Sequence, residues 1–231
     1  FCCVCGAAQN TCTGMTTMSF EIFDNLFQIA VMLLSMTAAF ALAIRFRSRR
    51  YVMLGCGYGC FMMGTLYYVL HIVIMGYNPK IFYVSEFSWL SSYLFYLSLL
   101  ISRTTEKRRK RRVPALLDAL LIAAASLLIG ILGPSPLSSG AYAVTAGAIA
   151  YLSVRRMLEH PGNLRHACRP ELLLGCILII QCAVYAISAV TEDFTRFNAN
   201  FAADLLLTLC MASLNAAIYP EERALSSHDL H

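Results

Sequence analysis

The stretch that decides the fold is residues 23–50, FDNLFQIAVMLLSMTAAFALAIRFRSRR. Seventeen of its first 22 residues are apolar, and its last six include four arginines. About 20 residues of α-helix cross the roughly 30 Å hydrocarbon core of a bilayer. An arginine cluster directly after such a run is typical of a loop that stays in the cytoplasm. The stretch therefore predicts a membrane-spanning helix that enters from outside the cell.

The same pattern repeats along the 231-residue chain, of which 58% is apolar and 13% is charged. The mean hydropathy is +0.64. These values exclude a soluble domain, which is roughly a quarter charged, and a disordered chain, which is poor in apolar residues. Apolar runs occur at about 22–44, 51–76, 83–102, 114–133, 137–154, 171–190 and 199–219. We predict an all-α polytopic membrane protein with seven transmembrane helices.

The distribution of basic residues predicts the orientation. Sixteen of the 18 Lys and Arg residues would lie on one side of the membrane, in the segments 45–50, 103–112 and 155–169 and in the tail after residue 219. Only Lys80 and Arg196 would lie on the other side. The positive-inside rule then places the N-terminus outside and the C-terminus in the cytoplasm. We expect a multi-pass protein of the bacterial inner membrane, because the chain is compact and shows no targeting segment.

Three parts follow from this topology. Residues 1–21 are predicted to be a short extracytoplasmic segment without regular structure, 22–219 the seven-helix bundle, and 220–231 a cytoplasmic tail. Pro220 is expected to end the last helix, because proline cannot continue the backbone hydrogen bonding. Met18 directly precedes the first apolar run and would suit a natural start, so residues 1–17 are left out of the fold prediction.

One alternative topology stays open. The run 137–154 is short and rich in Ala and Gly, and if 114–154 were a re-entrant hairpin the chain would cross five times with unchanged termini. Seven spans are favoured, because non-helical backbone exposed to lipid is costly. Pairs of small residues four apart predict close helix packing, within the chain first and in a dimer second. These pairs are Gly55 with Gly59, Ala143 with Gly147, and Ala146 with Ala150.

Ionisable side chains inside the spans are costly in lipid, so each is a candidate functional residue. They are Asp24, His71, Glu86, Asp118 and Asp204. All except Asp118 would fall in the outer third of the bundle. This clustering predicts a polar region that faces the outside of the cell.

One face of the third span carries Glu86, Trp89, Tyr93 and Tyr96, spaced three and four residues apart. Turned inward, this face would help to build an outward-opening, aromatic-walled pocket for a cationic or amine-bearing small ligand. The predicted ligand-binding residues are His71, Glu86, Trp89, Tyr93 and Asp204. Two alternatives remain, an interfacial belt of aromatic residues with acids at headgroup level, and a proton relay.

No catalytic signature, cofactor motif or metal site is predicted. Cys2, Cys3 and Cys5 lack the paired spacing of a zinc site. The basic run Arg103–Arg112 is expected chiefly to hold the orientation, and anionic lipid is its second expected partner. A nucleic acid is not expected as a partner of a chain with this many spans.

Residues 66–100, LYYVLHIVIMGYNPKIFYVSEFSWLSSYLFYLSLL, combine an aromatic helix end, a Gly-x-x-Pro turn and an acidic helix start. This run resembles the multi-span sensory modules that precede diguanylate cyclase or histidine kinase domains in bacteria. The resemblance implies that Glu86, Trp89 and Tyr93 are sensor-core positions. Only a dozen residues follow the last span, so a sensor of this kind would act alone or through a cytoplasmic signalling partner.

The sequence therefore predicts a non-catalytic sensory or ligand-binding protein of the membrane, in contact with membrane lipids. Two alternatives remain open, a small-molecule transporter and a membrane-embedded enzyme that acts on lipids.

Overall fold

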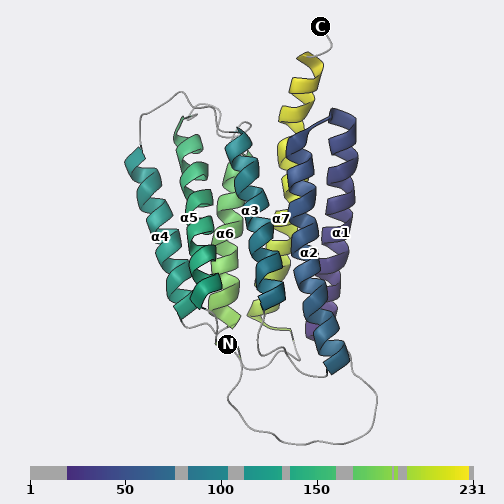
Figure 1. Cartoon of the computed structure of the whole chain (residues 1–231), viewed down its shortest axis with the longest axis vertical. Coiled ribbons are helices and arrows are strands. Elements are labelled where there is room, and N and C mark those ends of the chain that lie inside the picture. Colours follow the sequence, from purple (N-terminus) through teal and green to yellow (C-terminus); the bar gives the residue numbers. More distant parts are fainter. Residues whose placement is uncertain are drawn as a thin grey trace, which may run out of the picture.

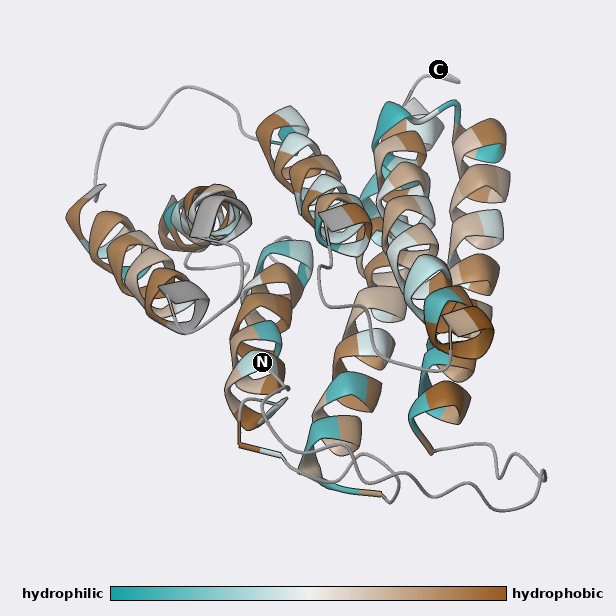
Figure 2. Ribbon diagram, turned by 60° about the horizontal axis from the view of Figure 1, so that its bottom comes forward, coloured by the Kyte–Doolittle hydropathy of each residue, from teal (hydrophilic) through white to brown (hydrophobic). Residues whose placement is uncertain are grey.

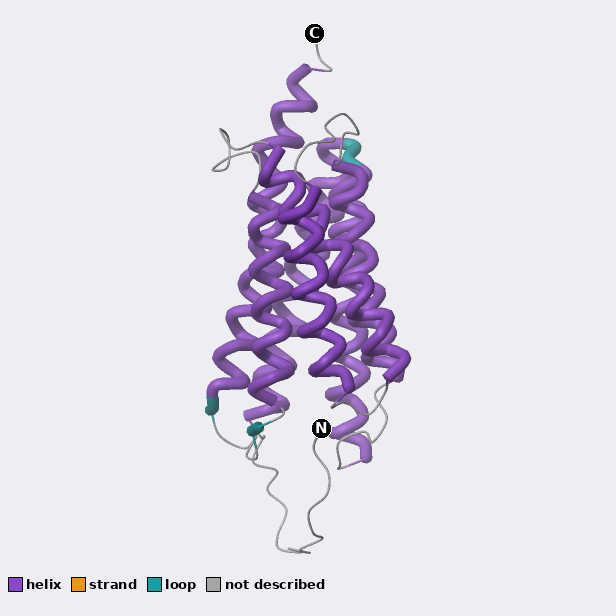
Figure 3. Tube along the Cα trace, turned by 90° about the vertical axis from the view of Figure 1, so that its left-hand side faces the viewer, coloured by secondary structure: helices purple, strands orange, loops and turns teal. Residues whose placement is uncertain are grey.

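The computed structural model describes residues 20–75, 83–103, 112–131, 136–159, 169–188, 190–191 and 197–228. This part of the chain is helical and contains no strand (Figure 3). The helices are α1 (Phe20–Phe46), α2 (Arg49–Met75), α3 (Tyr83–Arg103), α4 (Arg112–Ile131), α5 (Pro136–Glu159), α6 (Arg169–Ser188) and α7 (Ala199–His228). The predicted all-α class is confirmed. Of the predicted N-terminal segment, residues 1–19 lie outside the described residues, and Phe20 and Glu21 belong to α1.

The seven helices stand side by side with alternating direction (Figure 1). Neighbour contacts connect α1, α2, α3, α5, α6 and α7 into a closed ring, because α7 also packs on α1. Helix α4 lies outside the ring and packs on α5 and α6. We call the end of the bundle where α1, α3, α5 and α7 end the basic end (top of Figure 1), and the other end the distal end.

Five of the described helices, α1, α2, α3, α6 and α7, are long and apolar enough to cross a membrane. Apolar residues run along the lengths of the helices (Figure 2). In α4 the shorter segment Val113–Leu128 is apolar. Large apolar side chains point away from the bundle on several helices, for example Leu34, Ile74 and Ile179. Such a surface indicates a lipid environment, because soluble monomers rarely expose large apolar patches. The chain is an integral membrane protein.

Helix α2 packs closely on both neighbours through its glycines. A β-carbon at Gly55 would lie 3.0 Å from the ring of Phe40 in α1, and one at Gly57 would lie 2.7 Å from Tyr96 in α3. Gly147 in α5 likewise approaches the backbone of α4. The predicted intramolecular packing of small residues is thus confirmed. Gly57 also packs closely on α3, although it was not one of the pairs of small residues four apart.

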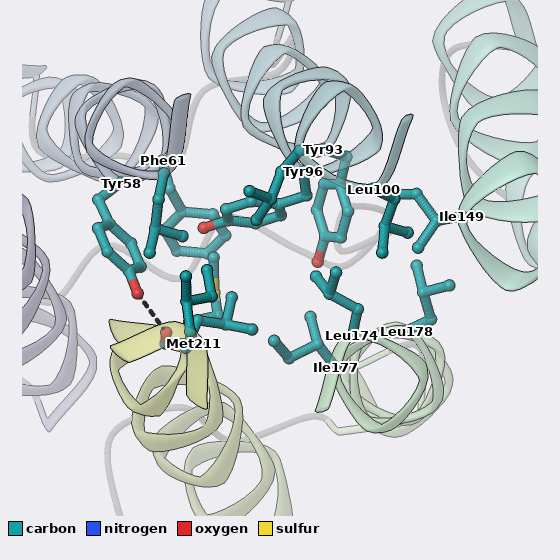
Figure 4. Packing of buried hydrophobic residues seen from close by; sticks show 14 of the residues in the cluster. Tyr58, Phe61, Tyr93, Tyr96, Leu100, Ile149, Leu174, Ile177, Leu178 and Met211 are labelled. Carbon is teal, nitrogen blue, oxygen red and sulfur yellow. Dashed lines mark hydrogen bonds between the residues drawn. The ribbon is translucent and has the colours of Figure 1, made fainter. Parts of the chain in front are cut away.

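Tyrosine and aliphatic side chains fill the centre of the ring (Figure 4). The hydroxyl of Tyr58 donates to the carbonyl oxygen of Met211 at 2.7 Å, and that of Tyr51 donates to the carbonyl oxygen of Asn215 at 3.0 Å. Both bonds tie α2 to α7 across the ring. Tyrosine suits this position because its ring packs against apolar neighbours while its hydroxyl finds a backbone acceptor.

The prediction that Pro220 ends the last helix was wrong. Helix α7 continues through Pro220 to His228 and extends past its neighbours (yellow, Figure 1). Proline removes one backbone donor. The turn that follows is held by ion pairs from Glu221 and Glu222 to Arg50 and Arg103, which a local sequence pattern does not reveal.

We expect Gly57→Ala to destabilise the protein by about 1–3 kcal/mol, the usual cost of overpacking a filled core. The added methyl group would overlap the ring of Tyr96, which is fully buried in the core. The measurement is the melting temperature in detergent. Gly175→Ala is the matched control, because no atom lies within 4 Å of its β-carbon position. Equal melting temperatures for both variants would contradict the packing described here.

Candidate ligand site at the distal end

Gln28 of α1 is the centre of a polar cluster near the distal end. Its amide nitrogen lies 3.2 Å from each carboxylate oxygen of Asp204 and 3.2 Å from the hydroxyl of Thr208, both in α7. Its amide oxygen accepts a hydrogen bond of 2.8 Å from Thr65 in α2. Gln28, Thr65 and Thr208 are buried. We call Asp24, Gln28, Thr65, Asp204 and Thr208 the distal cluster.

Two carboxyl groups meet in this cluster. The carboxyl groups of Asp24 in α1 and Asp204 in α7 lie close enough together to interact. Asp24 is buried and Asp204 is half-buried, so this acid pair is held within the bundle. No cationic side chain is bonded to it within the described residues.

Trp89 is the one predicted aromatic residue that joins the distal cluster. Its indole nitrogen donates to the hydroxyl of Thr65 at 3.4 Å, and its ring lies 6.4 Å from that of Phe61. The ring passes so close to α2 that a β-carbon at Gly64 would lie 2.8 Å from it. Four helices, α1, α2, α3 and α7, therefore contribute to one connected set of hydrogen bonds.

Tyr93 belongs to a second cluster, between α3, α5 and α6. Its hydroxyl donates to Gln181 at 2.7 Å, and its ring is 5.2 Å from Tyr142 and 5.9 Å from Tyr96. Tyr93 and Tyr96 are fully buried. An interfacial belt therefore does not account for them. They pack within the core, so they line no open aromatic wall in this structure.

Glu86 and His71, the remaining predicted residues, lie near the distal end and are half-buried. Tyr185 in α6 is close enough to both Glu86 and Asp204 to interact with their charges. The imidazole ring of His71 lies 6.3 Å from the ring of Tyr67, one turn away in α2. The structure thus connects Trp89 to Asp204 through Thr65 and Gln28 and places Glu86 near the same region.

Sequence reasoning missed Gln28, Thr65 and Thr208. Gln28 follows Asp24 by one helical turn inside an apolar run, so the rule that singled out the buried acids would also have found it. Thr65 and Thr208 carry no such signal, because threonine is common in membrane helices and often bonds to its own backbone. Only the packing of α2 and α7 against α1 reveals their part.

At the basic end the structure corrects the expectation for Arg103. Its side chain is fully buried and lies 3.1 Å from Glu171 and 2.6 Å from Glu221. Arg103 therefore faces protein carboxylates and not lipid headgroups. Residues 104–111 of the predicted lipid-contacting run lie outside the described residues.

No protein family model matches the chain, and no curated protein or solved structure matches it significantly.

The distal cluster combines two acidic side chains with hydrogen-bonding oxygens and an indole ring. A protonated amine or another small organic cation would find a charge partner in the acid pair and an aromatic face in Trp89. Within the described residues, no group of three or more His, Cys, Asp and Glu side chains is arranged to hold a metal ion.

We expect Gln28→Leu to lower the free energy of unfolding by about 1–3 kcal/mol for each polar partner left without its hydrogen bond. The partners at risk are Thr65 and Asp204, which both bond to the Gln28 amide. Thermal unfolding in detergent measures the loss. The control is Thr37→Val, because Thr37 is on the exposed side of α1 and bonds only to the backbone oxygen of Leu34. A stable Gln28→Leu protein would contradict the central role of the amide.

Proposed function

We propose that the protein is a sensory membrane receptor that binds a small cationic or amine-bearing ligand at the distal cluster. The observation that carries this proposal is the pair of neighbouring carboxyl groups of Asp24 and Asp204, with Asp204 bonded to Gln28 where four helices meet. Acidic groups inside a membrane bundle are costly and mark functional positions. In this proposal Glu86 and Trp89, two residues singled out in the sequence, contribute to the site from α3.

We further propose seven spans with the distal end outside the cell and the basic end in the cytoplasm of a bacterial inner membrane. Helix α4 supports this topology, because it presents Leu117, Leu121 and Leu128 away from the bundle. At 20 and 24 residues, α4 and α5 are each long enough to cross as helices. Sixteen of the 18 Lys and Arg residues are in segments assigned to the basic end, which supports a cytoplasmic location of that end.

Sensing is preferred to transport because of the packing between the two ends. Tyr58, Tyr96, Leu174 and Met211 are almost fully buried and fill the ring beyond the distal cluster (Figure 4). A ligand bound at the distal cluster would be separated from the basic end by these side chains. The proposal includes a cytoplasmic partner that receives the signal, and anionic lipid as the partner of the basic run.

The topology has a direct test. In a protein whose native cysteines are replaced by serine, Ser139→Cys at the start of α5 should react with a membrane-impermeant thiol reagent added from outside. Ser226→Cys near the end of α7 is the control and should react only after the membrane is opened. Failure of Ser139→Cys to react from outside in intact cells would favour the five-span topology. External labelling of Ser226→Cys would reverse the proposed orientation.

The ligand proposal is tested by thermal shift with putrescine, choline and guanidinium as probes. At least one probe should raise the melting temperature of the wild-type protein, since a ligand that binds only the folded state stabilises it. Asp204→Asn and Glu86→Gln should abolish that shift, because each removes an acidic group from the proposed site or its surroundings. Asp118→Asn is the control, because Asp118 lies in α4 towards the basic end of the bundle, away from the proposed site. Wild-type shifts in both distal variants would overturn the proposed site.

A further inference from the structure

Six charged side chains form a neutral cluster at the basic end. They are Arg50, Arg103, Arg156, Glu171, Glu221 and Glu222. These residues come from α2, α3, α5, α6 and α7, so five of the six ring helices meet in one set of ion pairs. We call this set the ion-pair cluster.

The inner part of this cluster is sealed from solvent. Glu171 lies 3.1 Å from Nε of Arg103 and 2.8 Å from Nε of Arg156. Arg156 also donates to the backbone carbonyl oxygen of Arg103. The side chains of Arg103 and Glu171 are both 0% exposed. Breaking a buried pair by removing one partner is strongly destabilising, so α3, α5 and α6 stay joined here.

The outer part of the cluster consists of the ion pairs between the two acids of α7 and the arginines of α2 and α3. It is partly open to solvent. Glu221 bridges Nη1 of Arg50 at 2.8 Å and Nη2 of Arg103 at 2.6 Å, and Glu222 lies 3.0 Å from Nη1 of Arg50. The side chains of Arg50 and Glu221 are 22% and 31% exposed. Partly exposed ion pairs are much weaker than sealed ones. The α7 contacts can therefore open while the inner part remains closed.

Opening would still leave Arg103 an ion-pair partner, because it would lose Glu221 but keep Glu171. Arg50 and Glu221 already reach solvent, and Glu222, whose side chain is only 7% exposed, would leave the cluster together with the end of α7. Both acids of α7 directly follow Pro220, where the helix lacks one backbone hydrogen bond and bends most easily. Movement of the end of α7 would therefore break only its own ion pairs.

Helix α7 also carries Asp204 of the distal cluster, 17 residues or about 26 Å before Glu221. Between the two points α7 is tied to α1 by the amide of Asn215, which donates to the backbone oxygen of Ser35 at 3.0 Å. The tyrosines of α2 tie it at Met211 and Asn215. A shift of α7 at Asp204 would strain these bonds along the helix as far as Pro220, the residue directly before Glu221.

We propose that the ion-pair cluster is a latch on α7, and that a cation bound at the distal cluster releases the α7 end (residues 221–228) from Arg50 and Arg103. The inference rests on the proposed sensory function and adds its output step. A ligand shifts such an equilibrium only if it binds the two states with different affinity. Here the difference in ligand affinity would come from Asp204, because this residue is part of α7 and its position depends on whether the end of α7 is latched or released.

The latch is tested by hydrogen exchange and mass spectrometry on the full-length protein in nanodiscs. Glu221→Gln combined with Glu222→Gln should speed exchange of the amides of 221–228 by about tenfold, the factor expected for one lost charge-assisted hydrogen bond. Arg50→Gln should have the same effect without altering α7. Glu21→Gln, an acid near the distal end, is the control. Wild-type exchange in both latch variants, with α1 still protected, would overturn the latch.

Coupling between the two ends is tested on the same peptides. Asp204→Asn should change the exchange rate of 221–228 at least about threefold, since it alters the distal contacts of α7. Asp118→Asn should leave that rate unchanged. An unchanged rate in Asp204→Asn would overturn transmission through α7 even if putrescine still binds the wild-type protein. Absence of any probe-induced thermal shift would instead count against the proposed ligand, because the exchange experiment needs no ligand.

Discussion

A polar group buried inside a helix bundle must find its partner within the protein, because neither lipid nor apolar side chains offer one. This constraint explains both polar centres of the molecule. At the distal end Gln28 joins Asp204, Thr65 and Thr208. At the basic end Arg103 is sealed between Glu171 and Glu221. Each centre connects helices that lie far apart in the sequence, and each fixes how those helices are placed around the ring.

The apolar packing between these centres makes the bundle one mechanical unit. Glycines let α2 approach its neighbours closely, and buried tyrosines bond from α2 to backbone oxygens of α7. In lipid there is little hydrophobic force between helices, so close contact and hydrogen bonds carry the association. Helix α7 takes part in both polar centres and in these bonds. It is therefore the element through which one end of the bundle can affect the other.

Local patterns predicted the helices well and the site in part. The apolar runs located all seven helices, because burial in lipid demands long apolar segments. An inward-facing pocket wall and an interfacial belt both stayed open for the face of Trp89 and Tyr93, and in the structure the two residues belong to different clusters inside the bundle. Pro220 did not end α7, because long-range ion pairs hold the turn that follows it. The cost of a polar side chain in lipid, which singled out Asp24 and Asp204, applies to the amide of Gln28 as well.

The sequence by itself determined the all-α class, the membrane environment and the segregation of basic residues to one side, since these depend on composition and order along the chain. Only the tertiary structure decided that Gln28 meets Asp204, that Arg103 faces Glu171 and that α4 stands outside the ring. Those outcomes depend on which helix faces which neighbour. Pairings across 68 or 176 residues leave no periodic trace in the chain. They arise because a buried polar or charged side chain destabilises any arrangement of the helices that leaves it without a partner.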